Sequence, residues 1–159
     1  MKIIDLSPEH EQLYFKCLED WSPEMSESGN HKECWFGKKM EKARVKLAAD
    51  DAGNIGGMIQ YIPIEESFAE GHDLYMVLCI WVHGYKDGRG NFQKKGMGRA
   101  LLKAAEDDVI SLGAKGLAAW GVSLPFWMKA SWFKKHGYEI ADKERDRKST
   151  RLNSSHGKL

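Results

Sequence analysis

The sequence predicts an α/β fold, and three observations support this prediction. Residues 74–82 form a nearly unbroken apolar run of strand length. After a short connection, two glycines at positions 96 and 98 precede a segment whose apolar residues recur at helical spacing until Gly113. A second strand pattern at 115–122 and a second helical pattern follow it. Strands and helices that alternate in this way are typical of a layered domain in which helices cover a sheet.

The other elements follow from local patterns in chain order. Ser7 and Pro8 are suited to a helix start. The turn chemistry of residues 50–54 joins two apolar strand patterns. The run at 74–82 has too little polar alternation to face water, so it is expected in the middle of the sheet. The predicted elements are a strand at 2–6, a helix at 8–20, a loop at 21–30, a helix at 32–42, strands at 44–49 and 55–64, a helix from 97, a helix that begins at 123–125 and a strand start at 138–143.

Length, charge and cysteine content exclude several classes of protein. A chain of 159 residues fits one domain with a substantial core. Its formal net charge is only +1, so no nucleic-acid or membrane partner is expected. Three cysteines without paired spacing predict reduced thiols and a cytoplasmic location. His31 and Cys34 lack the second pair that a zinc site needs, so no metal is expected. No apolar run reaches the roughly 18 residues that span a bilayer.

The segment around Gly96 and Gly98 predicts an anion site. It lies between an apolar strand and an amphipathic helix. The first helical turn leaves backbone N–H groups without partners and carries the positive end of the helix dipole. Glycines let a phosphate approach that backbone, and Lys94, Lys95 and Arg99 add positive charge. The alternative for the same residues is a basic loop in solvent without a function.

The pattern Gln-x-x-Gly-x-Gly at residues 93–98 resembles the acetyl-CoA pyrophosphate loop of the GNAT N-acetyltransferase family. The order of strands and helices around it agrees with that family over residues 1–143. The resemblance implies the GNAT acyl-CoA N-acyltransferase fold, with a central mixed sheet of about six strands flanked by about four helices. It also implies acetyl-CoA as co-substrate and direct transfer of the acetyl group to an amine in a ternary complex. We expect the acceptor to be a small molecule.

The resemblance also implies which residues form the site. The strand at 74–82 would contact the pantetheine arm, and aromatic residues would line the slot for the thioester and acceptor. The cofactor-binding residues expected on this basis are Ile80, Val82, Gln93, Lys94, Lys95, Gly96, Met97, Gly98 and Arg99. The expected substrate residues are Trp35, Trp120, Ser123 and Trp127. For aromatic residues such as Trp35, packing in the core is the alternative role.

The sequence departs from the family pattern at both usual catalytic positions. Met76 stands where some members carry a glutamate on the central strand. Phe133 stands where many carry a tyrosine, and phenylalanine has no proton to give to the leaving thiolate. His83 is then the candidate general base, since imidazole titrates in the physiological range. These departures also leave open a non-catalytic acyl-CoA-binding or sensor domain.

Two charged connections lie beside the expected site. The connection at 83–92 contains three glycines, and its Lys86 and Arg89 either reach the phosphates of the cofactor or lie in solvent. The acidic connection at 65–71 either attracts an amine or is a solvated face.

The C-terminal segment does not resemble the rest of the family domain. No apolar run follows residues 138–143, so the last strand of the fold is expected to be missing. Residues 146–156 resemble the translation of a sequencing adapter, which predicts a truncated gene from a draft or metagenomic source. We therefore expect an acetyltransferase domain at 1–145 and a non-native or disordered tail at 146–159. A basic tail that binds nucleic acid is the alternative. An unpaired sheet edge would favour a homodimer.

Overall fold

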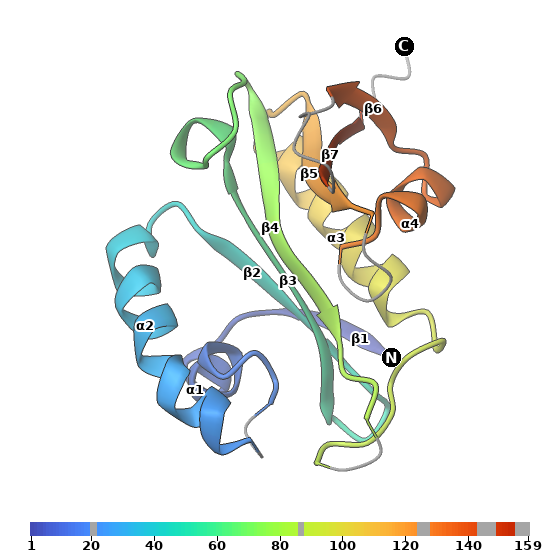
Figure 1. The fold of residues 1–159 in the computed structure, drawn as a ribbon. Coiled ribbons are helices and arrows are strands. Elements are labelled where there is room, and N and C mark those ends of the chain that lie inside the picture. The colour runs from blue at the N-terminus through green and yellow to red at the C-terminus, as the bar shows by residue number, and fades with distance from the viewer. Residues whose placement is uncertain (20–21, 86–87, 124–127, 143–148, 155–159) are drawn as a thin grey trace. The chain divides into compact units, whose positions relative to one another are not determined.

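The structure is a computed structural model that describes residues 1–19, 22–85, 88–123, 128–142 and 149–154. The chain divides into two compact units, residues 1–60 with 80–104 and residues 61–79 with 105–159. Figure 1 shows the elements, which follow one another as β1 (Lys2–Asp5), the 3-10 helix η1 (Pro8–His10), α1 (Glu11–Phe15), α2 (Pro23–Lys39), β2 (Arg44–Ala49), β3 (Ile55–Pro63), the 3-10 helix η2 (Ile64–Glu66), β4 (Leu74–Val82), α3 (Met97–Ser111), β5 (Gly116–Val122), α4 (Ala130–Lys135), β6 (Glu139–Asp142) and β7 (Ser149–Ser154).

The strands form one mixed sheet, as predicted. Their order is β1-β2-β3-β4-β5-β7-β6, so β4 is the middle strand. β1 pairs antiparallel with β2, whereas β4 pairs parallel with β5 from Leu74↔Gly116 to Val77↔Ala119. A parallel pair needs a crossover, and α3 provides it. The predicted α/β fold and the central position of residues 74–82 are confirmed.

The expectation that the last strand is missing is wrong. β7 lies between β5 and β6 and pairs antiparallel with both of them. The sequence prediction relied on an apolar run, but strand addition needs only backbone N–H and C=O groups, which any non-proline residue provides. The β5 edge pairs with β7 from Leu117 to Val122. The domain boundary at residue 145 and the non-native origin of the tail stay predictions.

The second helix begins earlier than the sequence prediction. α2 starts at Pro23 and includes Gly29, both of which were interpreted as loop residues. Proline is favoured at the first helical position because its missing N–H would have no helical partner there. Ser22 precedes it and donates from its hydroxyl to Glu24 at 2.8 Å. The glycine costs the helix about 1 kcal/mol, which tertiary packing can offset.

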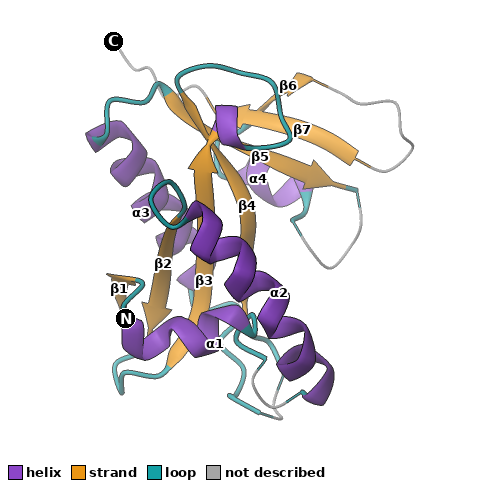
Figure 2. Cartoon of the chain, turned by 90° about the vertical axis from the view of Figure 1, so that its left-hand side faces the viewer, coloured by secondary structure: helices purple, strands orange, loops and turns teal. Residues whose placement is uncertain are grey.

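The first helix is shorter than predicted. α1 ends at Phe15, and Cys17 and Leu18 have positive φ angles of 53° and 64°. Non-glycine residues seldom adopt this conformation, so the chain reverses sharply here. α1 packs on β3 and on α2: the Tyr14 hydroxyl donates to Gln60 of β3 at 2.7 Å, and the centre of the Tyr14 ring lies 5.3 Å from that of Phe36 in α2. Figure 2 shows α1 and α2 in front of the strands.

Each unit has its own contacts between its strands and α3. In one unit, Tyr75 contacts Tyr61, whose hydroxyl donates to Asp108 of α3 at 2.6 Å. In the other, a Cβ added to Gly57 would meet Leu101 of α3 at 3.0 Å and Val82 at 3.3 Å.

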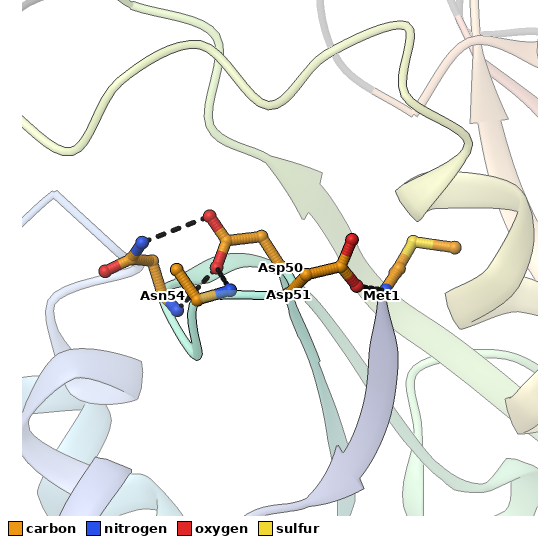
Figure 3. Close-up of polar contacts among 5 residues, drawn as sticks. Met1, Asp50, Asp51 and Asn54 are labelled. Carbon is orange, nitrogen blue, oxygen red and sulfur yellow. Dashed lines mark hydrogen bonds and ion pairs between the residues drawn. The ribbon is translucent and has the colours of Figure 1, made fainter.

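The turn between β2 and β3 is organised by Asp50. One of its carboxylate oxygens accepts from the backbone N–H of Ala52 at 3.0 Å and of Asn54 at 2.8 Å (Figure 3). The other accepts from the Asn54 amide at 3.1 Å. Next to it, Asp51 pairs with the amino group of Met1. The Asn54 side-chain amide, the Asn54 backbone N–H and, to a smaller extent, the Ala52 N–H and Lys95 hold the pKa of Asp50 below its ordinary 3.8.

We expect Asp50→Ala to lower the urea midpoint of unfolding, because three donors of the turn lose their acceptor. The folded-state pKa of Asp50 is lowered, so its stabilisation is fully present above the ordinary value of 3.8 and is lost as pH falls through the lowered value. The difference between the wild type and Asp50→Ala should therefore shrink as the pH falls below 3.8. Urea titrations at pH 7 and pH 3 measure it. Asp50→Asn, which keeps an acceptor oxygen, should lose less, and equal midpoints for all three proteins would contradict the assignment.

Candidate functional site

Residues 93–98, called the glycine loop below, lead into α3 and include its first residues, as predicted. Gly96 has a φ of +84°, and its carbonyl accepts from the N–H of Ala100 at 3.0 Å, the first bond of the helix. A Cβ added to Gly96 would meet no atom within 4 Å. The N–H groups of the first turn have no acceptor within the helix by its geometry. The backbone at Gly96 is therefore open to an approaching anion, and it adopts a conformation that favours glycine.

Positive charge gathers at this helix end. Lys94, Lys95 and Arg99 are all exposed. Lys94 has a φ of +60°, and the Lys95 ammonium lies 5.4 Å from the centre of the Phe92 ring. Exposed cations at a helix N-terminus attract phosphate through both the side-chain charge and the dipole. The buried face of α3, with Met97, Leu101, Leu102, Ala105 and Val109, holds the helix in place.

The connection at residues 83–92, which precedes the glycine loop, is anchored on β3 and on the end of β4. The His83 N–H donates to the Gly56 carbonyl, and the His83 carbonyl accepts from the Phe92 N–H, both at 2.9 Å. Phe92 is buried against Gly56, where an added Cβ would lie 2.3 Å from its ring. Arg89 donates to the Ile55 carbonyl at 3.3 Å. Lys86, the other residue considered for the phosphates, lies outside the described residues.

Gly56→Ala should weaken acetyl-CoA binding by about tenfold, because its methyl group would displace Phe92 and loosen the support of the glycine loop. Calorimetric titration of acetyl-CoA measures the change. The double variant Gly56→Ala/Phe92→Leu should recover part of the affinity, since a smaller side chain frees the space. Equal affinity of Gly56→Ala and wild type would show that the packing of Phe92 has no influence on the loop.

A backbone group at the end of β4 contacts the glycine loop. The Val82 carbonyl accepts from the Gln93 side-chain amide at 3.3 Å. Because the next residue, His83, bonds to β3, strand alternation directs the Val82 groups to the opposite edge. Ile80 lies two residues before Val82. In a regular strand, the backbone N–H and C=O groups of these two residues point to the same edge. The predicted cofactor-binding residues Ile80, Val82 and Gln93 to Arg99 therefore all belong to one unit.

A buried polar cluster joins the end of β4 to the turn after α1. Oε1 of Glu19 lies 3.0 Å from Nδ1 of His83 and accepts from the Trp81 indole N–H at 3.0 Å. His83 is fully buried and Glu19 is 9% exposed. A carboxylate that holds one imidazole nitrogen fixes the orientation of the ring, which is the arrangement of a base and its orienting group. Burial means that a proton has to reach His83 through a bound molecule or an ordered water.

The sequence did not indicate Glu19. On a helix that continues to residue 20, Glu19 would lie away from the apolar stripe of Leu13, Tyr14, Cys17 and Leu18. The positive φ angles of Cys17 and Leu18 reverse the chain instead. This turn directs Glu19 inward, toward Trp81 and His83. No sequence signal marks such a reversal, because neither residue is a glycine or asparagine.

The expected substrate residues lie in different units. Trp35 is half-buried on α2, in the unit that contains the glycine loop. Trp120 is half-buried on β5 and Ser123 is exposed directly after it, in the other unit. Trp127 lies outside the described residues.

Met76 and Phe133, which stand at the two usual catalytic positions of the family pattern, are part of the core. Met76 is fully buried in a cluster with Ile64, Ala69 and Ala118. Phe133 is fully buried, and its ring lies 5.3 Å from that of Tyr138. Both side chains are held by apolar packing, and neither can exchange a proton. Within the described part of the chain, no three His, Cys, Asp or Glu side chains are grouped to hold a metal, and no helix is long and apolar enough to cross a membrane.

Comparison with known proteins gives a family match. A model of the acetyltransferase (GNAT) family matches residues 7–138, which include the glycine loop and β4. No curated protein matches the chain.

Solved structures share the fold at low identity. The aminoglycoside 6'-N-acetyltransferase from Enterococcus faecium has a TM-score of 0.68 at 16% identity, with 98% of this chain and 97% of that chain covered. The spermidine/spermine N-acetyltransferase SpeG from Vibrio cholerae has a TM-score of 0.66 at 14% identity, covering 96% and 93%. The PaiA N-acetyltransferase from Thermoplasma acidophilum, in complex with coenzyme A, has a TM-score of 0.65 at 15% identity, covering 98% and 100%.

Proposed function

The chain belongs to the acetyltransferase (GNAT) family, and from this premise we propose that it transfers an acetyl group from acetyl-CoA to a small-molecule amine. The family prediction and the prediction of a GNAT-type N-acetyltransferase are thereby confirmed. The observation that carries the proposal beyond the family is the open backbone at Gly96, at the start of α3 and among three exposed cations.

The residues at the start of α3 fit the pyrophosphate of acetyl-CoA. A backbone without a side chain in its way, a helix N-terminus and the charges of Lys94, Lys95 and Arg99 are complementary to a dianionic group. We assign phosphate binding to Gln93, Lys94, Lys95, Gly96, Met97, Gly98 and Arg99. Ile80 and Val82 would offer backbone groups to the pantetheine arm. When bound, acetyl-CoA supplies a thioester whose carbonyl carbon an amine can attack.

The proton balance of the reaction defines what the protein has to do. One N–C bond forms and one C–S bond breaks, so an ammonium group loses two protons. One of them ends on the CoA thiol and the other is released. An amine has to be deprotonated before it attacks, and a general base accelerates this step about 100- to 10,000-fold. We propose His83 as this base, with Glu19 as the residue that orients it, on the strength of their 3.0 Å contact.

The proposed acceptor is a small molecule with a primary amine. Two of the fold relatives are named for acetylation of aminoglycosides and of spermidine or spermine, which are small amines. The second candidate function is binding of acyl-CoA without catalysis, which the apolar side chains Met76 and Phe133 favour. A cytoplasmic location and a homodimer stay predictions.

A panel of amines separates the two functions. The purified chain is mixed with acetyl-CoA and, one at a time, with aliphatic diamines, aromatic amines, an aminoglycoside and a lysine peptide, and the release of CoA thiol is recorded. We expect release with at least one small amine at a rate well above that with acetyl-CoA alone. Acetyl-CoA binding without release for any amine would support the binding domain, and release with the peptide alone would overturn the small-molecule assignment.

A further inference from the structure

A lysine side chain lies beside a cysteine thiol where the end of α1 meets α2. Nζ of Lys32, on α2, is 3.3 Å from Sγ of Cys17, which follows α1. The sulfur of Met58 is 3.9 Å from the same nitrogen. All three residues belong to one unit. Thiols and amines are both nucleophiles toward acyl groups, and the chemistry assigned above uses neither Cys17 nor Lys32.

One backbone carbonyl holds the two residues next to each other. The Tyr14 carbonyl accepts from the Lys32 ammonium at 2.7 Å and from the Cys17 N–H at 3.0 Å. The ammonium also lies 3.8 Å from the centre of the Tyr14 ring, which is a cation–π contact. Tyr14 is fully buried. The short distance between Sγ and Nζ is therefore built into the fold and is not a chance meeting of two surface side chains.

The pair is within reach of a reagent in solution. Cys17 lies in the backbone reversal after α1, with a φ of 53°, and is only partly buried. Lys32 is also only partly buried. A small molecule that reacts with the thiol would therefore find an amine next to the atom it has modified.

We propose that Cys17 and Lys32 form an acylation site for thioesters of the acyl-CoA type, in which Cys17 accepts the acyl group and passes it to Lys32. In the first step, the sulfur of Cys17 attacks the thioester carbonyl carbon. A new C–S bond forms, the old C–S bond breaks, and the thiol proton of Cys17 goes to the thiol that leaves.

The second step moves the acyl group from sulfur to nitrogen. Lys32 first loses one ammonium proton to water, and its amine then attacks the carbonyl carbon on Cys17. The N–C bond forms, the C–S bond breaks, and a second proton of the nitrogen returns to the sulfur. Cys17 is thus regenerated, and the products are an amide at Lys32, a free thiol and one proton.

The distance and the contacts of Lys32 explain why this transfer is favourable and what it changes. Groups that a protein holds about 3–3.5 Å apart react as if at a very high concentration, and Nζ lies 3.3 Å from the sulfur that would carry the acyl group. Acylation removes the charge of Lys32, and with it the cation–π contact to Tyr14. This contact adjoins the turn that directs Glu19 toward His83, so the modification would act on that turn.

The full chain is incubated with S-acetyl-N-acetylcysteamine, a thioester without a nucleotide, and mass spectrometry after proteolysis gives the acetylation rate of each lysine. Lys32 should react about tenfold faster than Lys2, an exposed lysine of the same unit that exposure alone would favour. Cys17→Ser should slow acetylation of Lys32 about tenfold, because a hydroxyl is a much weaker nucleophile. Cys34→Ser is the matched control, since Cys34 is an exposed cysteine of α2, and it should change neither rate. Circular dichroism checks the fold of each variant.

Lys32→Met provides a second test, because the acyl group then has no amine to move to. It should accumulate on Cys17 as a thioester that hydroxylamine removes. Equal acetylation rates of Lys32 and Lys2, or an unchanged Lys32 rate in Cys17→Ser, would overturn the proposal. So would the absence of a hydroxylamine-sensitive acetyl group on Cys17 in Lys32→Met. The probe carries no phosphate, so these outcomes are independent of the glycine loop, and the panel of amines decides the proposed function separately.

Discussion

Gly96→Glu should abolish acetyl-CoA binding at concentrations at which the wild type is saturated, a loss of about 100-fold or more. The substitution places a carboxylate at the backbone that the phosphates would approach, and it repels them where a charge-assisted hydrogen bond was to form. A further cost comes from the φ of +84°, which a side chain disfavours by about 1 kcal/mol. Calorimetric titration of acetyl-CoA into the two proteins measures the difference.

Gly113→Glu is the matched control for this experiment. Gly113 has a φ of +83° and open space around its Cβ position, as Gly96 does, but it follows the other end of the same helix. The variant therefore carries the same strain and the same charge, but beyond the C-terminal end of the helix instead of at its start. It should bind acetyl-CoA like the wild type. Equal losses in both variants would attribute the effect to backbone strain, and wild-type binding by Gly96→Glu would overturn the assigned phosphate site.

His83→Gln should lower kcat/KM for the amine by about 100-fold or more and leave the Kd for acetyl-CoA unchanged, if His83 accepts the proton. Glutamine is chosen because its amide can still donate to Glu19 and keep that buried carboxylate partnered. Steady-state kinetics with the best amine of the panel, together with calorimetry for acetyl-CoA, give the two quantities.

His136→Gln serves as the control, since His136 lies at the end of α4 and bonds to the Trp132 carbonyl. Its kinetics should match the wild type. A weaker acetyl-CoA affinity of His83→Gln with an unchanged kcat would contradict the base and assign the His83 side chain to the support of the connection at residues 83–92.

The parts of the fold that were predicted correctly are those with a strong local signal. The run at 74–82 matched β4 residue for residue, because β4 is the middle strand and apolar side chains suit both of its faces. α3 was recognised from its apolar stripe and from the glycines before it. The start of α2 was missed because Pro23 is equally common in loops and at the first position of a helix.

The sequence by itself determined the α/β class, the glycine loop at the start of α3 and the resemblance to the acetyltransferase family, because each depends on residues that are close along the chain. Only the tertiary structure decided the partners of His83, the contact of Cys17 with Lys32 and the insertion of β7 into the sheet. Glu19 and His83 are 64 residues apart. Whether two such side chains meet depends on the backbone reversal at Cys17 and Leu18 and on the packing of the sheet, and no local pattern encodes either.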